Sequence, residues 1–245
     1  MKRWGTLHGM LLLLILWYIA AALIQSPIVP VPHRVLLPAL QELPQPATLL
    51  HIASSLYRII CGILLALLFG IPAGIISGRS RLLDGIISPL LYLLYPIPKI
   101  AFLPVFMVIL GIGDISKIAL ITVIIFFPIT VFIRDGVQRI SQTYIELAMV
   151  LSLSQKEILR SIIFPGILPD IFSAIRISLG ISLSVLFFSE NIAASHGLGF
   201  MIMNSWIMAH YTGMYAGIVY LSLLGILLYR LLDRIEISLT PWTRQ

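Results

Sequence analysis

Long apolar runs separated by short polar stretches dominate the pattern of this chain. Six of them approach or exceed the roughly 20 apolar residues that a helix needs to cross a bilayer. The runs cover residues 4–25, 51–77, 85–110, 117–135, 171–194 and 214–232. Between them lie a proline-rich stretch at 26–46, turns at 78–84 and 111–116, a polar segment at 140–170 and a loop at 196–213. The pattern predicts an all-α, polytopic membrane protein with six transmembrane helices.

The prolines divide this predicted architecture further. Residues 1–50 are expected to form a first transmembrane helix and a proline-rich external segment, and residues 51–235 a core of five helices with the polar segment. Pro96, Pro98 and Pro104 are expected to break the third span. The basic start and the run after it also suit a cleaved signal peptide, but Trp17 and Tyr18 extend the run, so we expect a retained helix.

Composition supports a membrane protein. The 245 residues are 59% hydrophobic and 11% charged, whereas soluble domains carry about 25% charged residues. Cys61 is the single cysteine, which excludes a disulfide framework or a cysteine-based metal site within one chain. No metal site is expected.

The basic residues indicate an orientation. All but four of the 16 Lys and Arg residues fall at the ends of spans that face the cytoplasm if the N-terminus is inside. The four exceptions are Arg34, Arg58, Lys99 and Lys117. This bias predicts that both termini are cytoplasmic, and it explains the formal charge of +6 by topology rather than by nucleic-acid binding.

The polar segment is more elaborate than a simple connection. Thr143 and Glu146 have the spacing of a capping box, and so do Ser154 and Glu157. We expect two short helices that meet near Ser152, with Pro165 ending the second. Such a surface element on a membrane protein indicates a docking site for a soluble partner.

This segment also resembles the EAA motif of the permeases of ATP-binding-cassette (ABC) importers, which reads Glu-Ala-Ala, then Gly, then Ile-x-Leu-Pro. The matching positions are Glu146, Leu147, Ala148, Ser152, Ile162, Phe164 and Pro165. Leu147, Ser152 and Phe164 depart from the motif. The resemblance implies that Glu146, Ala148, Ser152, Glu157, Ile162, Phe164 and Pro165 couple the chain to an ATPase. A serine in place of the glycine would take a left-handed conformation only at some cost.

Further stretches resemble the permeases that import aliphatic sulfonates, taurine, nitrate and related small solutes. They are Ser54-Ser-Leu-Tyr-Arg58, Gly70-Ile-Pro-Ala-Gly74, Pro96-Ile-Pro-Lys-Ile-Ala101, Leu110-Gly-Ile-Gly-Asp-Ile-Ser-Lys117 and Ser195-His-Gly-Leu-Gly199. The resemblance implies the type I importer fold, a homodimer in the bacterial inner membrane, a solute-binding protein and a dimer of ATPase subunits. The chain lacks a phosphate-binding Gly-x-x-x-x-Gly-Lys-Ser/Thr loop. ATP and Mg²⁺ are therefore expected on the separate ATPase chain, and no cofactor on this one.

Two sites inside the spans are candidates for the solute path. Lys99 lies in the proline-broken third span, where a cation would suit an anionic solute, although pairing with a carboxylate or extension to the interface would also explain it. Glu190, with Asn191, either lines the path or serves as the buried partner of Lys99 or Arg58. Both interpretations remain open for each site.

Gly70, Gly74 and Gly78 form a stripe on one face of the second predicted helix. Because glycines let another helix approach closely, the stripe predicts helix packing, either within the subunit or at a gate or dimer contact.

Motifs for catalysis are lacking. The sequence contains neither His-Glu-x-x-His nor Gly-x-Ser-x-Gly, so we expect no catalytic residues and no enzyme. The predicted function is an alternating-access path for a sulfonate, nitrate or a similar small anion or heterocycle. The alternative is a channel or a structural scaffold of a membrane complex, which would need no docking site for an ATPase.

Overall fold

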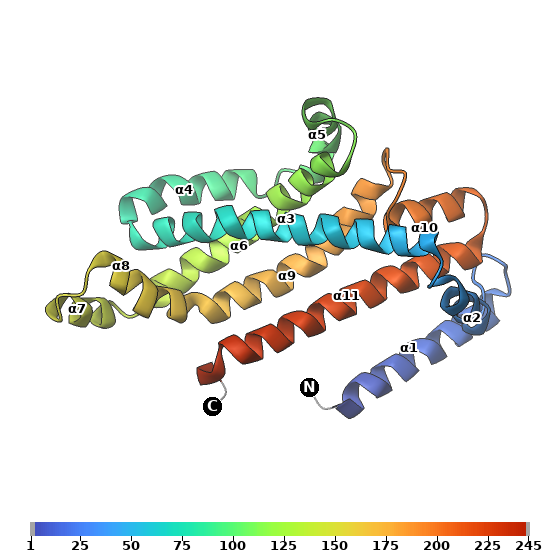
Figure 1. Cartoon of the computed structure of the whole chain (residues 1–245), viewed down its shortest axis with the longest axis horizontal. Helices are drawn as coiled ribbons and strands as arrows, with labels where there is room; N and C mark the ends of the chain where they lie inside the picture. Colours follow the sequence, from blue (N-terminus) through green and yellow to red (C-terminus); the bar gives the residue numbers. More distant parts are fainter. Residues whose placement is uncertain (1–2, 244–245) are drawn as a thin grey trace. The chain divides into compact units, whose positions relative to one another are not determined.

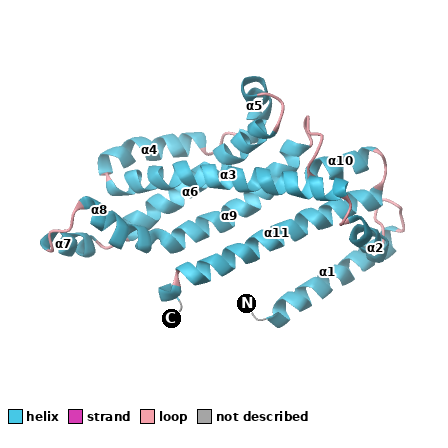
Figure 2. Cartoon of the chain, viewed as in Figure 1, coloured by secondary structure: helices cyan, strands magenta, loops and turns pink. Residues whose placement is uncertain are grey.

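Helices account for all the regular structure in residues 3–243, which a computed structural model describes (Figure 2). The α-helices are α1 (Arg3–Ile24), α2 (Pro32–Glu42), α3 (Pro46–Arg79), α4 (Arg81–Leu94), α5 (Leu103–Leu110), α6 (Asp114–Arg139), α7 (Gln142–Val150), α8 (Gln155–Ile158), α9 (Phe164–Glu190), α10 (Leu198–Ile207) and α11 (Tyr211–Leu239). Two 3₁₀ turns (Lys99–Phe102 and Pro241–Thr243) and a π-helical turn (Leu159–Ile163) complete them. Lys2 and Arg244, two of the basic residues assigned to the cytoplasmic side, lie outside the described residues.

Length and apolarity identify four helices able to cross a membrane within the described range. They are α3, α6, α11 and the continuous helix from Gln155 to Glu190. A fifth span is formed if α4 and the helical stretch Lys99–Leu110 are counted as one bent pair. The 22-residue α1, apolar over His8–Ile24, would be the sixth. The all-α membrane architecture is confirmed, while the count of six and the boundary after residue 50 stay predictions.

The predicted break in the third span is present. The two halves of the bent pair, Arg81–Leu94 and Lys99–Leu110, meet at an angle of 84°. Pro96 and Pro98 lie between them, and two prolines this close together remove two neighbouring backbone donors and weaken the helix at the bend. Pro104 stands near the N-terminus of α5, where a missing N–H costs nothing.

The chain forms two compact units. One contains residues 3–56 and 190–224, hence α1, α2, α10 and parts of α3 and α11. Trp17 Nε1 donates to the carbonyl oxygen of Pro30 at 3.0 Å, and its ring stacks on that of Tyr215. The Tyr220 hydroxyl donates to the carbonyl oxygen of Ala39 at 2.5 Å. These contacts hold the proline-rich stretch, which contains α2 flanked by irregular chain, against helices of the same unit.

The other unit contains residues 57–189 and 225–243. Within it the glycine stripe of α3 contacts α6. Figure 1 shows the ribbons of these two helices next to each other. A Cβ atom on Gly74 would lie 2.6 Å from Ile133 Cβ and 2.8 Å from the carbonyl oxygen of Thr130. One on Gly78 would lie 2.7 Å from the Cβ atom of Val137. The stripe therefore brings two helices of one subunit into backbone contact.

A carboxylate in the second unit ties α3, α4 and α6 together. Asp84 of α4 accepts hydrogen bonds from Ser77 Oγ at 2.9 Å and from Ser88 Oγ at 2.6 Å. Arg134 of α6 donates to it from Nε at 2.5 Å and from Nη2 at 3.0 Å. This two-pronged geometry is the strongest form of an arginine–carboxylate pair, and it fixes the hairpin of α3 and α4 on α6.

One predicted loop is a helix. Residues 196–213 were expected to be irregular, but α10 occupies Leu198–Ile207. Its sequence is mostly apolar, and Leu198 and Ile202 are buried. Burial of these side chains stabilises a helix that is too short to form alone in water.

Candidate functional site

The polar segment begins with a cap that differs from the predicted one. Ser141 is the N-cap of α7, and its Oγ accepts from the backbone N–H of Thr143 at 3.3 Å. Thr143 itself lies inside the helix, so the capping box predicted for Thr143 and Glu146 is wrong. The reason is that another good capping residue stands two positions earlier. Glu146 instead exposes its side chain on α7.

The end of α7 is a Schellman motif. Ser152 has φ of 59°, the backbone N–H of Ser152 donates to the carbonyl oxygen of Met149 at 2.9 Å, and that of Leu153 donates to Ala148 at 3.0 Å. Ser152 therefore takes the left-handed conformation in spite of its cost, at a position where glycine would meet no steric cost. Ala148 is buried at this turn.

The helix that follows begins with the predicted capping box. The backbone N–H of Ser154 donates to Glu157 Oε2 at 2.7 Å, and the N–H of Glu157 donates to Ser154 Oγ at 3.3 Å. Both partners thus satisfy backbone donors that a helix start leaves open. Glu157 has a structural role at this start.

Pro165 does not end the second helix as predicted. The chain passes through the π-helical turn Leu159–Ile163, where the N–H of Phe164 donates to the carbonyl oxygen of Leu159, and continues into α9. A π turn holds an extra residue, which lets a proline enter a helix without the carbonyl clash of a regular α turn. Ile162 is half-buried within this turn, and Phe164, directly after it, is exposed.

Two contacts brace the segment against the rest of its unit. Arg79, the last residue of α3, donates from Nη2 to Gln155 Oε1 at 2.5 Å. Arg139, the last residue of α6, forms an ion pair with Asp170 of α9. The ends of α3 and α6 therefore hold the chain on both sides of the π-helical turn Leu159–Ile163, at Gln155 and at Asp170.

The surface of the segment combines a groove with exposed apolar residues. A cavity of about 550 Å³ lies between α7 and the start of α9, lined by residues that include Tyr144, Leu147, Leu151 and Ile162. Leu147, Leu151 and Val150 are 55%, 65% and 80% exposed. Apolar side chains gathered in this way on a polar segment are typical of a protein–protein interface.

The interior cation Lys99 lies at the break between α4 and α5. Its Nζ donates to the carbonyl oxygen of Tyr95 at 3.0 Å and lies 4.4 Å from the ring centroid of Phe127. Among the described residues, no carboxylate forms an ion pair with it. A cation held by a carbonyl and by the faces of Tyr95 and Phe127 keeps its charge available to a ligand.

Glu190 lies in the other unit, fully buried at the end of α9. Its carboxylate accepts from Ser55 Oγ at 2.9 and 3.0 Å and from the backbone N–H of Gly199 at 2.8 Å. Ser55 Oγ also accepts from the N–H of Leu198, and His51 Nδ1 accepts from that of Gly197. Asn191 follows directly and is half-buried.

Sequence reasoning missed this arrangement around Glu190. Two of the stretches that carried the family resemblance, Ser54–Arg58 and Ser195–Gly199, supply its hydrogen-bond partners. In the second unit, an ion pair joins the last residue of Ser54–Arg58 to the stretch Leu110–Lys117. Arg58 Nη2 lies 2.6 Å from Asp114 Oδ1. The only signal in the sequence was that these motifs occur together.

Comparisons of the sequence with known proteins find relatives among transport permeases. The chain is 37% identical over 97% of its length to the taurine transport system permease protein TauC of Escherichia coli K12, of which it covers 88%. It is 29% identical over 98% of its length to SsuC of Bacillus subtilis 168, whose name assigns it to aliphatic sulfonates transport, with 89% covered. It is 29% identical over 78% of its length to the nitrate import permease protein NrtB of a Synechocystis strain, with 70% covered.

A solved structure and a family model also match this chain. A chain of the MetNI methionine ABC transporter in an inward-facing conformation superposes with a TM-score of 0.69 at 22% identity, covering 80% of this chain and 99% of that chain. This similarity shows a shared fold. Residues 70–240 match the family model described as "Binding-protein-dependent transport system inner membrane component". The chain therefore belongs to this family of membrane-embedded transport permeases.

Proposed function

We propose that this permease works as a homodimer in an ATP-driven importer of a small anion, with an ATPase subunit docked on the polar segment of each copy. The observation that carries the proposal is the construction of that segment. Two short helices are each capped, joined by a left-handed serine and braced by Arg79, yet they expose Leu147, Val150 and Leu151. A rigid element with an exposed apolar edge suits insertion into a groove of a partner.

Coupling follows from how this element continues into the membrane. Through the π turn, α8 is continuous with α9, so a movement of α8 is passed directly to a transmembrane helix. The ATPase, which would carry ATP and Mg²⁺, moves the two copies of α8 when it closes on nucleotide. A ligand shifts such an equilibrium only by its difference in affinity between the two states. Glu146 would fix α7 on the ATPase surface.

The orientation and the solute supply complete the proposal. Lys156 and Arg160 of the polar segment belong to the basic residues predicted to be cytoplasmic, where an ATPase would dock. Both termini would then be cytoplasmic in a bacterial inner membrane, and a solute-binding protein would deliver the solute on the outer side. The names of the relatives favour sulfonates or nitrate as the solute class.

Replacing Glu146 tests the docking site. We expect Glu146→Ala to lower both solute-stimulated ATP hydrolysis and uptake by about tenfold, the effect of an interface residue worth roughly 1.4 kcal/mol. Glu42→Ala is the matched control, because it removes a carboxylate from α2, on the predicted outer side. Uptake and hydrolysis are measured in membranes that contain equal amounts of the permease and of the ATPase. Full activity of Glu146→Ala would refute the docking role.

A further inference from the structure

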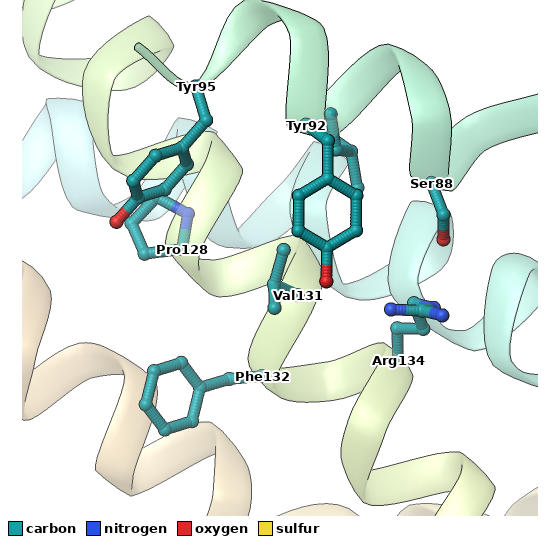
Figure 3. A pocket seen from close by; sticks show the side chains of 8 residues that line it. Ser88, Tyr92, Tyr95, Pro128, Val131, Phe132 and Arg134 are labelled. Atoms are coloured by element: carbon teal, nitrogen blue, oxygen red, sulfur yellow. The ribbon is translucent and has the colours of Figure 1, made fainter.

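Two neighbouring cavities lie along the helices α4 and α6. The first, of about 230 Å³, is lined by residues that include Tyr92, Tyr95, Val131 and Arg134 (Figure 3). The second, of about 280 Å³, is lined by residues that include Lys99 and Phe127. Tyr95 and Pro128 line both, so the two cavities adjoin each other. Together they fall within the size range of small-molecule sites, roughly 300–1,000 Å³.

Of the two cations at these cavities, only Lys99 is free to bind an anion. The guanidinium of Arg134 donates to Asp84 from Nε and Nη2 and to Asp135 from Nη1 at 3.3 Å. Carboxylates therefore already compensate its charge. Lys99 Nζ instead interacts with the carbonyl oxygen of Tyr95 and the ring of Phe127. An anion entering the second cavity would gain a charge-assisted contact without displacing a carboxylate.

The first cavity has a different chemistry from the second. In Figure 3 the rings of Tyr92 and Tyr95 project from α4 toward α6, where Pro128 and Val131 lie. Apart from Arg134, the polar groups of its lining are the hydroxyls of Ser88 and the two tyrosines, and Ser88 already donates to Asp84. Apolar and aromatic walls of this kind favour a hydrocarbon chain over a second charge.

We propose that the two cavities form one amphipathic solute site, which takes an aliphatic sulfonate with its sulfonate at Lys99 and its chain beside Tyr92 and Val131. This inference rests on the proposed function, since it names the solute class of the same importer. Nitrate has no chain with which to fill the first cavity. The ammonium group of taurine would stand near Arg134, which is unfavourable despite the compensation by Asp84.

Filling the first cavity tests the inference. Val131→Trp places a large side chain where the solute chain would lie. We expect this variant to lower kcat/KM for uptake of hexanesulfonate by at least about tenfold, since one methylene in an apolar pocket already changes kcat/KM by roughly that factor. Uptake of methanesulfonate, which has no chain beyond its methyl group, should change by less than about twofold on the same argument.

The comparison is made as a ratio of variant to wild type for each sulfonate. The solute-binding protein is the same in both transporters, so its own preference cancels in this ratio. Val123→Trp is the matched control, because Val123 lies on the same helix, is exposed and is not in the lining of either cavity. It should leave both ratios near one.

The outcomes separate the inference from the proposed function. Loss of hexanesulfonate uptake with methanesulfonate uptake retained supports the amphipathic site. Equal ratios for the two sulfonates in Val131→Trp, at an unchanged amount of transporter, overturn it. If Val131→Trp does not assemble, Val131→Phe is used with the same two readings. Absence of sulfonate uptake in the wild type would instead refute the sulfonate assignment and with it this inference, whereas the docking role of Glu146 is tested by ATP hydrolysis.

Discussion

The guanidinium of Arg79 donates a hydrogen bond to the side-chain carbonyl of Gln155 at 2.5 Å. It joins the last residue of α3 to the first residue of α8. Because α8 continues into α9 through the π turn, this contact connects two transmembrane helices at the base of the proposed ATPase dock.

Removing this contact should weaken the coupling of ATP hydrolysis to uptake rather than the stability of the fold. The bond is exposed, so we expect Arg79→Ala to cost about 1 kcal/mol, which corresponds to a fivefold loss of uptake per ATP hydrolysed. Gln155→Ala should have the same effect, and the double variant should be no worse than either single one, because both remove one interaction. Arg81→Ala is the control, since Arg81 is exposed nearby. A larger loss in the double variant would show that Arg79 and Gln155 do not act through one shared interaction.

The left-handed conformation of Ser152 predicts a substitution that stabilises the segment. Ser152→Gly should stabilise the segment by about 1 kcal/mol, because glycine takes a positive φ without steric cost. Slower hydrogen exchange at the amides of residues 152 and 153 would report this. Ser161→Gly, inside the π turn, should be destabilising by about the same amount, since glycine is a poor helix former. Faster exchange in Ser152→Gly would show that the serine side chain contributes more than its strain costs.

Ser152→Pro tests the same turn by disruption. Proline cannot adopt φ of 59° and has no N–H to donate to Met149. We expect this variant to lose assembly with the ATPase or to hydrolyse ATP without uptake. Normal uptake at a normal amount of complex would exclude a role for the turn in docking.

The sequence allowed the spans to be predicted because their signals are local. Apolar runs locate the transmembrane helices. Pro96 and Pro98 locate the break, because the loss of a backbone N–H affects the helix at that position. The spacing of Ser154 and Glu157 also predicted a capping box, which the structure confirms. The same spacing at Thr143 and Glu146 was not, because Ser141 competes for the same helix start. Spacing alone does not show which of two capping residues the chain will use.

Features that depend on distant parts of the chain could not be predicted. Ser55 and Glu190 are 135 positions apart, and no local pattern relates them. The helix α10 was missed because its apolar residues are too few to indicate a span, and its stability comes from burial. Pro165 was misread because a π turn, which removes the conflict between a proline and a helix, leaves no periodic signal in the sequence.

The packing of α3 on α6 predicts opposite outcomes for two glycines. Gly74→Ala should lower stability by roughly 1–3 kcal/mol, because its Cβ would meet the backbone of Thr130, which cannot rotate away. Gly85→Ala on α4 should be neutral or stabilising by about 1 kcal/mol, since nothing lies within 4 Å of its Cβ and alanine favours a helix. Thermal unfolding of the purified permease measures both. Equal stability of the two variants would contradict the close contact.

The predicted orientation is tested by labelling from one side of the membrane. Gln41 on α2 and Lys156 on α8 are both exposed. Each is replaced by cysteine in a Cys61→Ala background and treated with a membrane-impermeant maleimide. We expect Gln41→Cys to react in intact cells freed of their outer membrane and Lys156→Cys only after the inner membrane is opened. Reaction of both before opening would exclude the six-helix topology with cytoplasmic termini.

The last prediction separates two roles of Lys99. If it contacts an anionic solute, Lys99→Met should abolish uptake without lowering the amount of assembled complex. Glu190→Gln should instead lower stability by roughly 1–3 kcal/mol, because Ser55 and Gly199 then donate to a neutral amide in place of a buried carboxylate. Independent roles make the effects of the two changes add in the double variant. If the residues are partners, each single change leaves one buried charge uncompensated, and the double variant should recover folded protein. Quantifying complex and uptake for the three variants decides between these roles, and normal uptake in Lys99→Met would remove Lys99 from the solute path.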